Sequence, residues 1–288
     1  MKFRDRKGNQ WEVQSSQDQL LERLYRSAYG RMLLRPLITP AVSKLGGALL
    51  DTKISRIAIS LFIRKNKIDM AQYVPTKYRS YNEFFIRKIK KEKRPIAKES
   101  KVLISPCDGK VSVYPIEKGS RFRIKHTEYT IESLTKSKRI AKQYEGGTLV
   151  ILRLTVDDYH RYCYPANGVK TRNFHIRGKF HTVNPIANDF YPIYKENTRE
   201  FTLLKTKDFG TIVQMEVGAL LVGKICNYQG KSRVKKGQEK GRFEFGGSTV
   251  VLLLEPNKVQ LDERLEANTK EGFETIVKMG EMLGYSMK

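Results

Sequence analysis

The chain has 288 residues, and its 55 Lys and Arg against 30 Asp and Glu give a formal net charge of +25 at pH 7. A hydrophobic fraction of 40% excludes a disordered chain and supplies enough apolar side chains for a sizeable core. No stretch of about 20 residues is apolar enough to span a bilayer, and the polar N-terminus lacks the apolar segment of a signal peptide. The charge favours an anionic partner, which can be nucleic acid or an anionic membrane surface.

Two segments in the first third, residues 17–34 and 51–65, have apolar side chains at helical spacing. Residues 1–100 contain 23 Lys and Arg against 9 Asp and Glu, so the positive charge is concentrated there. We interpret residues 1–100 as a basic, helical, membrane-associating region whose apolar faces enter the lipid while the bases meet the headgroups. A solvated basic face over an ordinary core contact is the alternative, and this feature alone leaves nucleic acid open.

After residue 100, short runs rich in Val, Ile, Tyr and Thr alternate with clusters of Gly, Asn and Asp, a pattern that predicts antiparallel strands. Residues 271–283 have apolar positions at helical spacing and predict a C-terminal helix. The expected fold class is α+β: basic N-terminal helices, a mainly antiparallel β-rich catalytic domain over residues 101–288, and the C-terminal helix. The predicted strands are Lys110–Pro115, Arg121–Lys125, Thr148–Val156, Lys179–Val183, Glu200–Lys205, Gly210–Cys226 and Ser248–Leu254.

The cysteines and histidines are few. Three scattered cysteines have no spacing typical of zinc ligands, so we expect no metal site and a reducing compartment. Any imidazole chemistry must come from the four histidines, which are His126, His160, His175 and His181.

Three segments after residue 100 carry side chains capable of chemistry. Residues 105–110, Ser-Pro-Cys-Asp-Gly-Lys, separate two predicted strands and on their own favour a plain β-turn. Residues 157–165 place two acids, a histidine, an arginine and a thiol in a loop after a strand, where functional sites concentrate.

The third segment begins with two glycines, Gly246 and Gly247, which precede Ser248 at the start of a very apolar strand. It is not a phosphate-binding loop, because no GxxxxGKS pattern exists and a strand follows instead of a helix. A β-bulge or tight turn is one interpretation. The other is chemical: glycine tolerates a strained turn in which the serine hydroxyl reaches the preceding carbonyl carbon.

In this order, the segments resemble the phosphatidylserine decarboxylase family of self-cleaving pyruvoyl enzymes, and the resemblance extends from about residue 78 onward. The segments that match the family are Phe84-Phe85-Ile86-Arg87-Lys88-Ile89-Lys90, Ser105-Pro106-Cys107-Asp108-Gly109, Tyr159-His160-Arg161-Tyr162 with Pro165, Val183-Asn184-Pro185, Asn197 with Arg199, Val217-Gly218-Ala219 with Val222-Gly223, and Lys236-Gly237-Gln238-Glu239 leading to Phe245-Gly246-Gly247-Ser248-Thr249.

The resemblance implies a proenzyme, or zymogen. Asp108 and a histidine would polarise the Ser248 hydroxyl, which attacks the carbonyl of Gly247 to form an ester. Elimination and hydrolysis would then leave a pyruvoyl group on the new N-terminus. The autocatalytic cleavage would produce a β chain of residues 1–247 and an α chain of residues 248–288, which stay together.

The same resemblance implies a lyase of phospholipid biosynthesis. The pyruvoyl carbonyl would form a Schiff base with the amine of phosphatidylserine and act as an electron sink while carbon dioxide leaves. His160 is our choice for the acid that protonates the α-carbon, and phosphatidylethanolamine is the product. We expect a peripheral protein on the cytoplasmic side of the cell membrane that meets its anionic lipid substrate at the surface; a homodimer is one option for its assembly.

Two positions depart from the family. The leucine that is common before Gly-Ser is Gly246 here. Cys163 stands where the family has the second histidine of its YHRxH segment, and a thiol with an ordinary pKa of about 8.5 is a poor base at neutral pH. His160 or His181 could replace it, since a turn could bring His160 round, and His181 opens a segment that matches the family. A surface position on a strand is the alternative for His181.

Two other functions stay open. A basic β-barrel that binds nucleic acid would explain the charge and the interleaved aromatics, but not the Gly-Gly-Ser-Thr segment together with the Asp and His motifs. A pyruvoyl decarboxylase of a soluble amino acid would explain those motifs, but not the basic amphipathic N-terminus.

Overall fold

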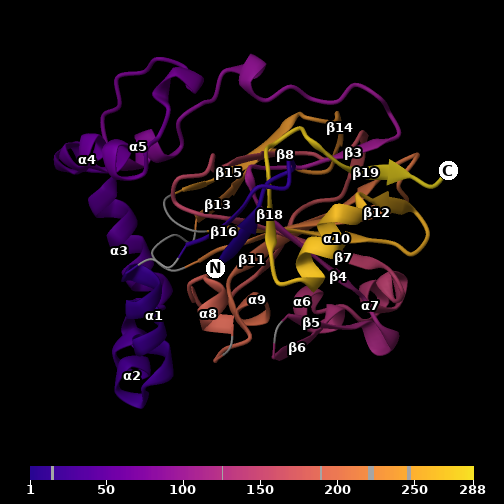
Figure 1. Ribbon diagram of the computed structural model, residues 1–288, viewed down its shortest axis with the longest axis horizontal. Helices are drawn as coiled ribbons and strands as arrows, with labels where there is room; N and C mark the ends of the chain where they lie inside the picture. The colour runs from indigo at the N-terminus through magenta and orange to yellow at the C-terminus, as the bar shows by residue number, and fades with distance from the viewer. Residues whose placement is uncertain (14–15, 125, 189, 220–223, 245–247) are drawn as a thin grey trace.

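The computed structural model describes the whole chain apart from residues 14–15, 125, 189, 220–223 and 245–247 (Figure 1). One long sheet forms the body, and its strand order is β14-β9-β11-β12-β16-β7-β4-β18-β1-β2, with β10 paired to β11. Its strands are β14 (Ser232–Val234), β9 (Gly168–Lys170), β11 (Arg199–Lys205), β12 (Thr211–Val217), β16 (Ser248–Leu254), β7 (Thr148–Leu154), β4 (Gly109–Pro115), β18 (Glu274–Val277), β1 (Lys2–Arg4), β2 (Gln10–Glu12) and β10 (Phe174–Ile176).

Three smaller sheets accompany the long sheet in the described part of the chain. The first has the order β13-β15-β8 and the second β17-β19-β3, and the third is the β5-β6 hairpin. These strands are β13 (Lys224–Asn227), β15 (Glu239–Glu244), β8 (Arg161–Cys163), β17 (Val259–Leu261), β19 (Met282–Ser286), β3 (Val102–Ile104), β5 (Arg121–Ile124) and β6 (Thr127–Thr130).

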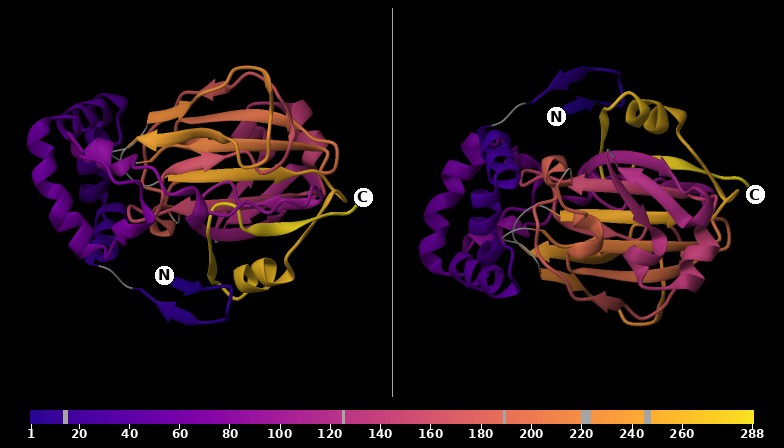
Figure 2. Two further views of the ribbon diagram at one scale, coloured as in Figure 1. Left: turned by 90° about the horizontal axis from the view of Figure 1, so that it is seen from above. Right: turned by 90° about the horizontal axis from the view of Figure 1, so that it is seen from below.

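Helices α1–α4 stand together at the end of the molecule opposite the C-terminus, in all three views (Figures 1 and 2). The short helices α6 and α7 follow the β5-β6 hairpin, and α10 packs against β4 and β18. The helices are α1 (Ser16–Arg26), α2 (Ala28–Leu37), α3 (Pro40–Leu50), α4 (Ile57–Lys65), α5 (Tyr81–Phe85), α6 (Ile131–Thr135), α7 (Lys138–Tyr144), α8 (Pro185–Asn188), α9 (Ile193–Glu196) and α10 (Glu263–Lys270).

The core lies on both faces of the long sheet, and β16 contributes to both. Val250, Leu252 and Leu254 belong to one buried cluster, while Val251 and Leu253 belong to the other. Successive strand side chains point to opposite faces, so a strand buried on both sides is apolar at every position. This explains the unbroken apolar run that the sequence shows after Thr249.

The α+β class is confirmed, and so are most of the predicted strands. Lys110–Pro115, Thr148–Val156, Glu200–Lys205 and Ser248–Leu254 correspond to β4, β7, β11 and β16, and Arg121–Lys125 to β5. Gly210–Cys226 contains β12 and the start of β13, with residues 220–223 outside the described part. Lys179–Val183 forms no strand and makes only an isolated bridge between Lys179 and Asn197.

The C-terminal helix exists but not where the sequence placed it. It is α10, whereas residues 271–283 contain β18 and the start of β19. Gly272 and Gly280 have φ angles of +81° and +91°, which an α-helix cannot contain. The apolar residues at helical spacing also satisfy the strand pattern, since Val277 and Leu283 are both buried in the core.

The first third is less helical than expected. Residues 2–12 form the β1-β2 hairpin, and β1 pairs with β18 at the edge of the long sheet. The predicted helix over residues 17–34 breaks at Ser27, whose side chain accepts a hydrogen bond from the N–H of Gly30 and caps α2. The division into domains at residue 100 stays a prediction, although the hairpin contributes to the sheet of the body.

Leu252 offers a test of the central role of β16. It is fully buried, so Leu252→Ala removes core contacts and leaves a cavity, and we expect a loss of about 3 kcal/mol in the free energy of unfolding. Urea titration measures the change. Val169→Ala, at a half-exposed position of β9, should alter it by less than about 1 kcal/mol. Equal losses in the two variants would contradict the placement of β16 in the core.

Candidate active site

The predicted site residues come from one end of the long sheet. β16 runs antiparallel to β7 and β12, with Ser248 opposite Leu154 and Thr249 opposite Val217. β4 is antiparallel to β7 with Lys110 opposite Arg153, which brings Gly109 level with Leu154. One end of the sheet therefore contains the starts of β16 and β4 and the ends of β7 and β12. The backbones at Ser248 and Gly109 lie two strand spacings, about 10 Å, apart.

The predicted cleavage position is described on one side only. Ser248 is the first residue of β16, whereas Gly246 and Gly247 lie outside the described residues. The strands before and after these residues, β15 and β16, are each held by backbone hydrogen bonds. The N–H of Phe243 in β15 donates to the carbonyl of His160 over 2.9 Å, and β16 pairs on both sides from its first residues.

His160 is fully buried immediately before β8. Its Nδ1 lies 2.9 Å from the carbonyl oxygen of Asp158, and its ring packs on Phe85 of α5 with 4.0 Å between ring centroids. Its Nε2 is buried and has no hydrogen-bond partner among the described residues. Burial lowers the pKa of His160 to about 3, so the ring is neutral at pH 7. A neutral ring whose Nδ1–H donates to Asp158 presents a free lone pair at Nε2.

The loop that carries His160 is held by a buried ion pair that the sequence did not single out. Lys110 Nζ lies 2.5 Å from Asp158 Oδ2, which also accepts from the N–H of Thr155 over 2.7 Å. Burial opposes the charge of Asp158, but Lys110 prevails and lowers the pKa of this carboxyl to about 2. Both residues lie inside the motifs that sequence reasoning marked, Lys110 after Asp108-Gly109 and Asp158 before His160, and only the fold pairs them.

Asp108 is buried at the start of β4, in a bend between β3 and β4. Its two carboxylate oxygens are engaged by Arg94 in a bidentate ion pair, with Arg94 Nε 2.7 Å from Oδ1, and Oδ1 also accepts from the N–H of Met279. Across the described residues, no hydrogen bond or ion pair joins Asp108 to His160 or His181. Arg94 is therefore a partner of the predicted relay acid that sequence reasoning missed, since a single arginine in a basic region gives no signal.

His181 is also buried, which shows that a surface position on a strand was wrong. Its ring stacks on Tyr191 at 4.7 Å, and its Nδ1 and Nε2 lie 3.5 Å from the hydroxyl of Tyr25 and 3.4 Å from Glu196. Burial lowers its pKa, against the opposing charge of Glu196. Asn197 fixes the backbone beside it.

Asn197 also ties His181 to the end of β12. Its side-chain amide donates to the carbonyls of both His181 and Gly218 over 2.8 Å, and it accepts from the N–H of His181. Gly218 follows Val217, which pairs with Thr249, so this amide connects the His181 segment with the strand next to Ser248. His160 follows β7 and His181 is tied to the end of β12, so the two histidines belong to the same end of the sheet, on opposite sides of β16.

Cys163 is buried in β8 with its thiol among Val102 and Ile104. Burial raises its pKa to about 12, so the thiol stays protonated at neutral pH. This agrees with the view that Cys163 is not the relay base; the assignment of that base to a histidine stays a prediction.

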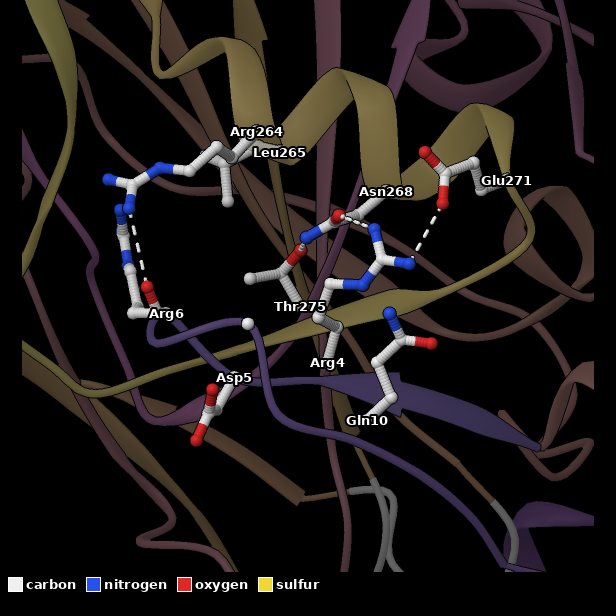
Figure 3. A pocket seen from close by; sticks show the side chains of 10 residues that line it. Arg4, Asp5, Arg6, Gln10, Arg264, Leu265, Asn268, Glu271 and Thr275 are labelled. Atoms are coloured by element: carbon white, nitrogen blue, oxygen red, sulfur yellow. Dashed lines mark hydrogen bonds and ion pairs between the residues drawn. The ribbon is translucent and has the colours of Figure 1, made fainter.

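A hollow of about 370 Å³ lies elsewhere, between the β1-β2 hairpin and α10 (Figure 3). Arg4 and Arg264 point into it, but Arg4 pairs with Asn268 and Glu271, and Arg264 pairs with Asp262. None of the predicted catalytic residues lines this hollow, so it is not the candidate site.

A second hollow, of about 390 Å³, opens between the N-terminal helices and the sheet β13-β15-β8, and none of the predicted catalytic residues lines it. Asp51, Arg79 and Asn82 line one side, and Lys224 and Glu244 line the other. Glu244 is the last residue of β15, so the hollow borders the strand that precedes the candidate cleavage position in the sequence. In the described part of the chain no three acidic, histidine or cysteine side chains are arranged to hold a metal ion.

Comparison with known proteins assigns the sequence. The family model described as phosphatidylserine decarboxylase matches residues 81–285. A relative named phosphatidylserine decarboxylase proenzyme 2, from Clostridium acetobutylicum, is 45% identical over 282 residues, which cover 98% of this chain and 96% of the relative. Phosphatidylserine decarboxylase proenzymes of Clostridium botulinum and Clostridium tetani are 36% and 37% identical over 99% of this chain and 99% and 98% of their own lengths.

The buried neutral state of His160 predicts a specific acid sensitivity. Below pH 6.5 a histidine in the unfolded chain binds a proton, whereas folded His160 stays neutral. The free energy of unfolding should therefore fall by about 1.4 kcal/mol for each pH unit down to about pH 3. Between pH 7 and pH 5 this amounts to about 2 kcal/mol, which His160→Gln should abolish. Urea titrations at the two pH values measure it, with His126→Gln at an exposed position as the control. An unchanged pH dependence in His160→Gln would mean that the ring is protonated in the folded protein.

Proposed function

The chain belongs to the phosphatidylserine decarboxylase family, and we propose that it decarboxylates phosphatidylserine as a self-cleaving proenzyme with a pyruvoyl group made from Ser248. The enzyme class follows from the family, whereas the cleavage and the pyruvoyl group are the proposal. The observation that supports them most is the position of Ser248 at the first residue of a strand that is paired on both sides and buried on both faces.

The self-cleavage needs a base for the Ser248 hydroxyl. The hydroxyl oxygen attacks the carbonyl carbon of Gly247, the peptide C–N bond breaks, and the nitrogen of residue 248 takes up a proton, leaving an ester. Loss of the Cα proton then expels the Gly247 carboxylate and leaves a dehydroalanine, whose hydrolysis yields ammonia and the pyruvoyl group. The Nε2 lone pair of His160 is suited to accept the hydroxyl proton because it is buried and unpaired.

Decarboxylation in this proposal uses the carbonyl group on the new N-terminus. The pyruvoyl group supplies an electron sink for the carbanion that forms when carbon dioxide leaves. The ammonium of phosphatidylserine must lose a proton before it reacts, and His160 Nε2 can take that proton and return it to the α-carbon. Sequence reasoning assigned only the second of these roles to His160. Its low pKa keeps the ring neutral at pH 7 and leaves the Nε2 lone pair available, and the same shift makes the nitrogen a weaker base.

His181 and Asp108 have positioning roles in this proposal. His181 is joined through Asn197 to Gly218 beside the start of β16, so it can hold that end of the site or serve as a second base. Asp108, neutralised by Arg94, fixes the bend before β4 at the same edge.

The cleaved chains stay together in this proposal. β16 pairs with β12 over five residues and with β7 over seven, and its side chains fill both cores. Residues 248–288 also contribute β18 and β19 to two sheets. Separation would expose all of this apolar surface, so one broken peptide bond leaves the fold in place.

The N-terminal helices provide the proposed membrane contact. α1 packs its apolar residues Leu21, Leu24 and Tyr25 against the body, so it is not an outward-facing helix as the sequence suggested. The segments after it expose large apolar side chains beside Lys and Arg. These are Tyr29, Met32, Leu33, Leu37, Leu45, Leu49, Ile54, Ile57 and Leu61.

Such a surface fits the interface of an anionic leaflet, and we propose a peripheral location on the cytoplasmic side of the cell membrane. The second hollow opens beside α3 and α5, and we propose it as the place where a lipid headgroup enters. Among the described helices, none combines the length and apolarity that a bilayer span requires.

Ser248→Ala tests the cleavage. Wild-type protein should run as two chains on a denaturing gel and as one particle on a sizing column, with a ketone on the small chain detected by mass spectrometry. Ser248→Ala should remain a single inactive chain of 33.3 kDa, because no hydroxyl is left to attack Gly247. Ser232→Ala, in the edge strand β14, is the control and should cleave normally. A wild-type enzyme that is active and uncut would refute the proposal.

The membrane contact is tested by substitution at its most exposed positions. Ile54 and Ile57 are about four-fifths exposed, and burial of an isoleucine in lipid contributes about 2 kcal/mol. Ile54→Glu/Ile57→Glu should therefore weaken binding to phosphatidylserine-containing vesicles by more than about tenfold in a sedimentation assay. Val169→Glu/Tyr285→Glu adds the same charge on β9 and β19 and should have a much smaller effect. Equal losses would show that charge alone governs binding.

A further inference from the structure

A fully buried ion pair joins β15, the strand that leads into the candidate cleavage position, to β12, which pairs with the strand that follows this position. Lys240 Nζ of β15 lies 2.5 Å from Glu216 Oε2 of β12, and neither side chain is exposed to solvent. Lys240 Nζ also donates to Asn227 Oδ1 over 2.7 Å, and Asn227 Nδ2 donates to Glu200 over 2.6 Å. Four strands, β11, β12, β13 and β15, thus meet at one polar cluster between the long sheet and the sheet β13-β15-β8.

The backbone of β15 is adapted to this contact. Glu239 pairs with Cys163 and Gly241 pairs with Tyr162, so Lys240 is the extra residue of a β-bulge. Gly241 lies so close to β13 that a Cβ would stand 2.2 Å from the carbonyl oxygen of Cys226. The bulge and the missing side chain together let β15 approach β13 while Lys240 reaches Glu216.

This pair is an inefficient way to stabilise the fold. Burial raises the pKa of Glu216 and lowers that of Lys240, which expresses the cost of removing both charges from water. Glu216 Oε1 has no hydrogen-bond partner among the described residues, so the desolvation is incompletely offset. Apolar side chains of similar size would often serve stability as well or better. The pair does, however, define one relative position of β12 and β15.

That relative position determines how the chain enters the cleavage segment. β15 ends at Glu244 and β16 begins at Ser248, so the connection spans at most about 14 Å. Glu216 lies opposite Val250 in the strand beside β16, and Lys240 lies four residues before the end of β15. A shift between β12 and β15 therefore changes the distance that the connection must cover, and with it the approach of a hydroxyl to the preceding carbonyl.

We propose that Glu216 and Lys240 are positioning residues for self-cleavage. Their ion pair sets the position of β15, which precedes the bond that breaks, relative to β12, which pairs with the strand that follows it. The role rests on the proposed cleavage between Gly247 and Ser248. It acts through the backbone, and neither side chain takes part in the bond changes. A misplacement of about 1 Å can slow a reaction by about a hundredfold, so loss of the pair should delay cleavage in a chain that is still folded.

Two variants separate positioning from stability. Lys240→Met removes one charge and leaves Glu216 buried and unpaired, whereas Glu216→Leu/Lys240→Met replaces the whole pair by apolar side chains. Each full-length proenzyme is made by pulsed translation in vitro, its cleavage is followed on gels, and its folded fraction is measured by resistance to protease. We expect cleavage at least about tenfold slower in Lys240→Met, and at least about fivefold slower in the double variant even though its folded fraction matches wild type.

Leu265→Ala is the matched control, because it removes a buried side chain of α10, a helix that packs mainly against β4 and β18 and carries neither member of the ion pair. It should lose stability and still cleave at the wild-type rate per folded molecule. A double variant that cleaves at the wild-type rate would overturn the positioning role and leave the pair a structural one. Normal cleavage in folded Lys240→Met would overturn it as well. If wild-type protein itself is never cut, the proposed function fails, and this role fails with it.

Discussion

The structure depends on a strand that starts at the serine and cannot leave the sheet. β16 is held by backbone pairing on both sides, and its side chains alternate between two cores. Any chemistry at Ser248 therefore happens at a fixed end, while the rest of the strand acts as an anchor. A bond broken before this strand gives a new terminus whose position is already determined, so a reactive group made there needs no separate binding site.

The same edge of the sheet supplies a low-dielectric environment. The rings of His160 and His181 are both buried, and burial lowers the pKa of each, so both are neutral at pH 7. The charges that the edge does contain, on Lys110, Asp158, Arg94 and Asp108, are paired and hold backbone segments in place. The site thus separates its structural charges from the neutral nitrogen that can exchange a proton.

Much of this arrangement could be predicted from the sequence, because β-strand alternation, turn residues and the motif order are local or linear signals. The apolar run of β16, the turn around Asp108 and the loop with His160 were recognised in this way. The helix predicted over residues 271–283 was wrong because these residues satisfy a helical and a strand pattern together. The positive φ angles of Gly272 and Gly280 exclude the helix. Partners such as Arg94 with Asp108, or Glu216 with Lys240, are 14 and 24 residues apart and become visible only when strands are assigned to sheets.

The N-terminal region has two different surfaces, and the sequence alone does not show that one of them contacts the buried histidines. Its outer surface on α2–α4 carries the exposed apolar side chains, while its inner surface contributes a ring to each buried histidine, Tyr25 of α1 at His181 and Phe85 of α5 at His160. The carbonyl of Ile38 also accepts from the N–H of Phe180, one residue before His181. Deleting these helices would remove part of the wall of the candidate site along with the proposed membrane contact. Point substitutions on the outer surface are therefore the changes that can test the proposed lipid binding separately from catalysis, because they leave the inner contacts in place.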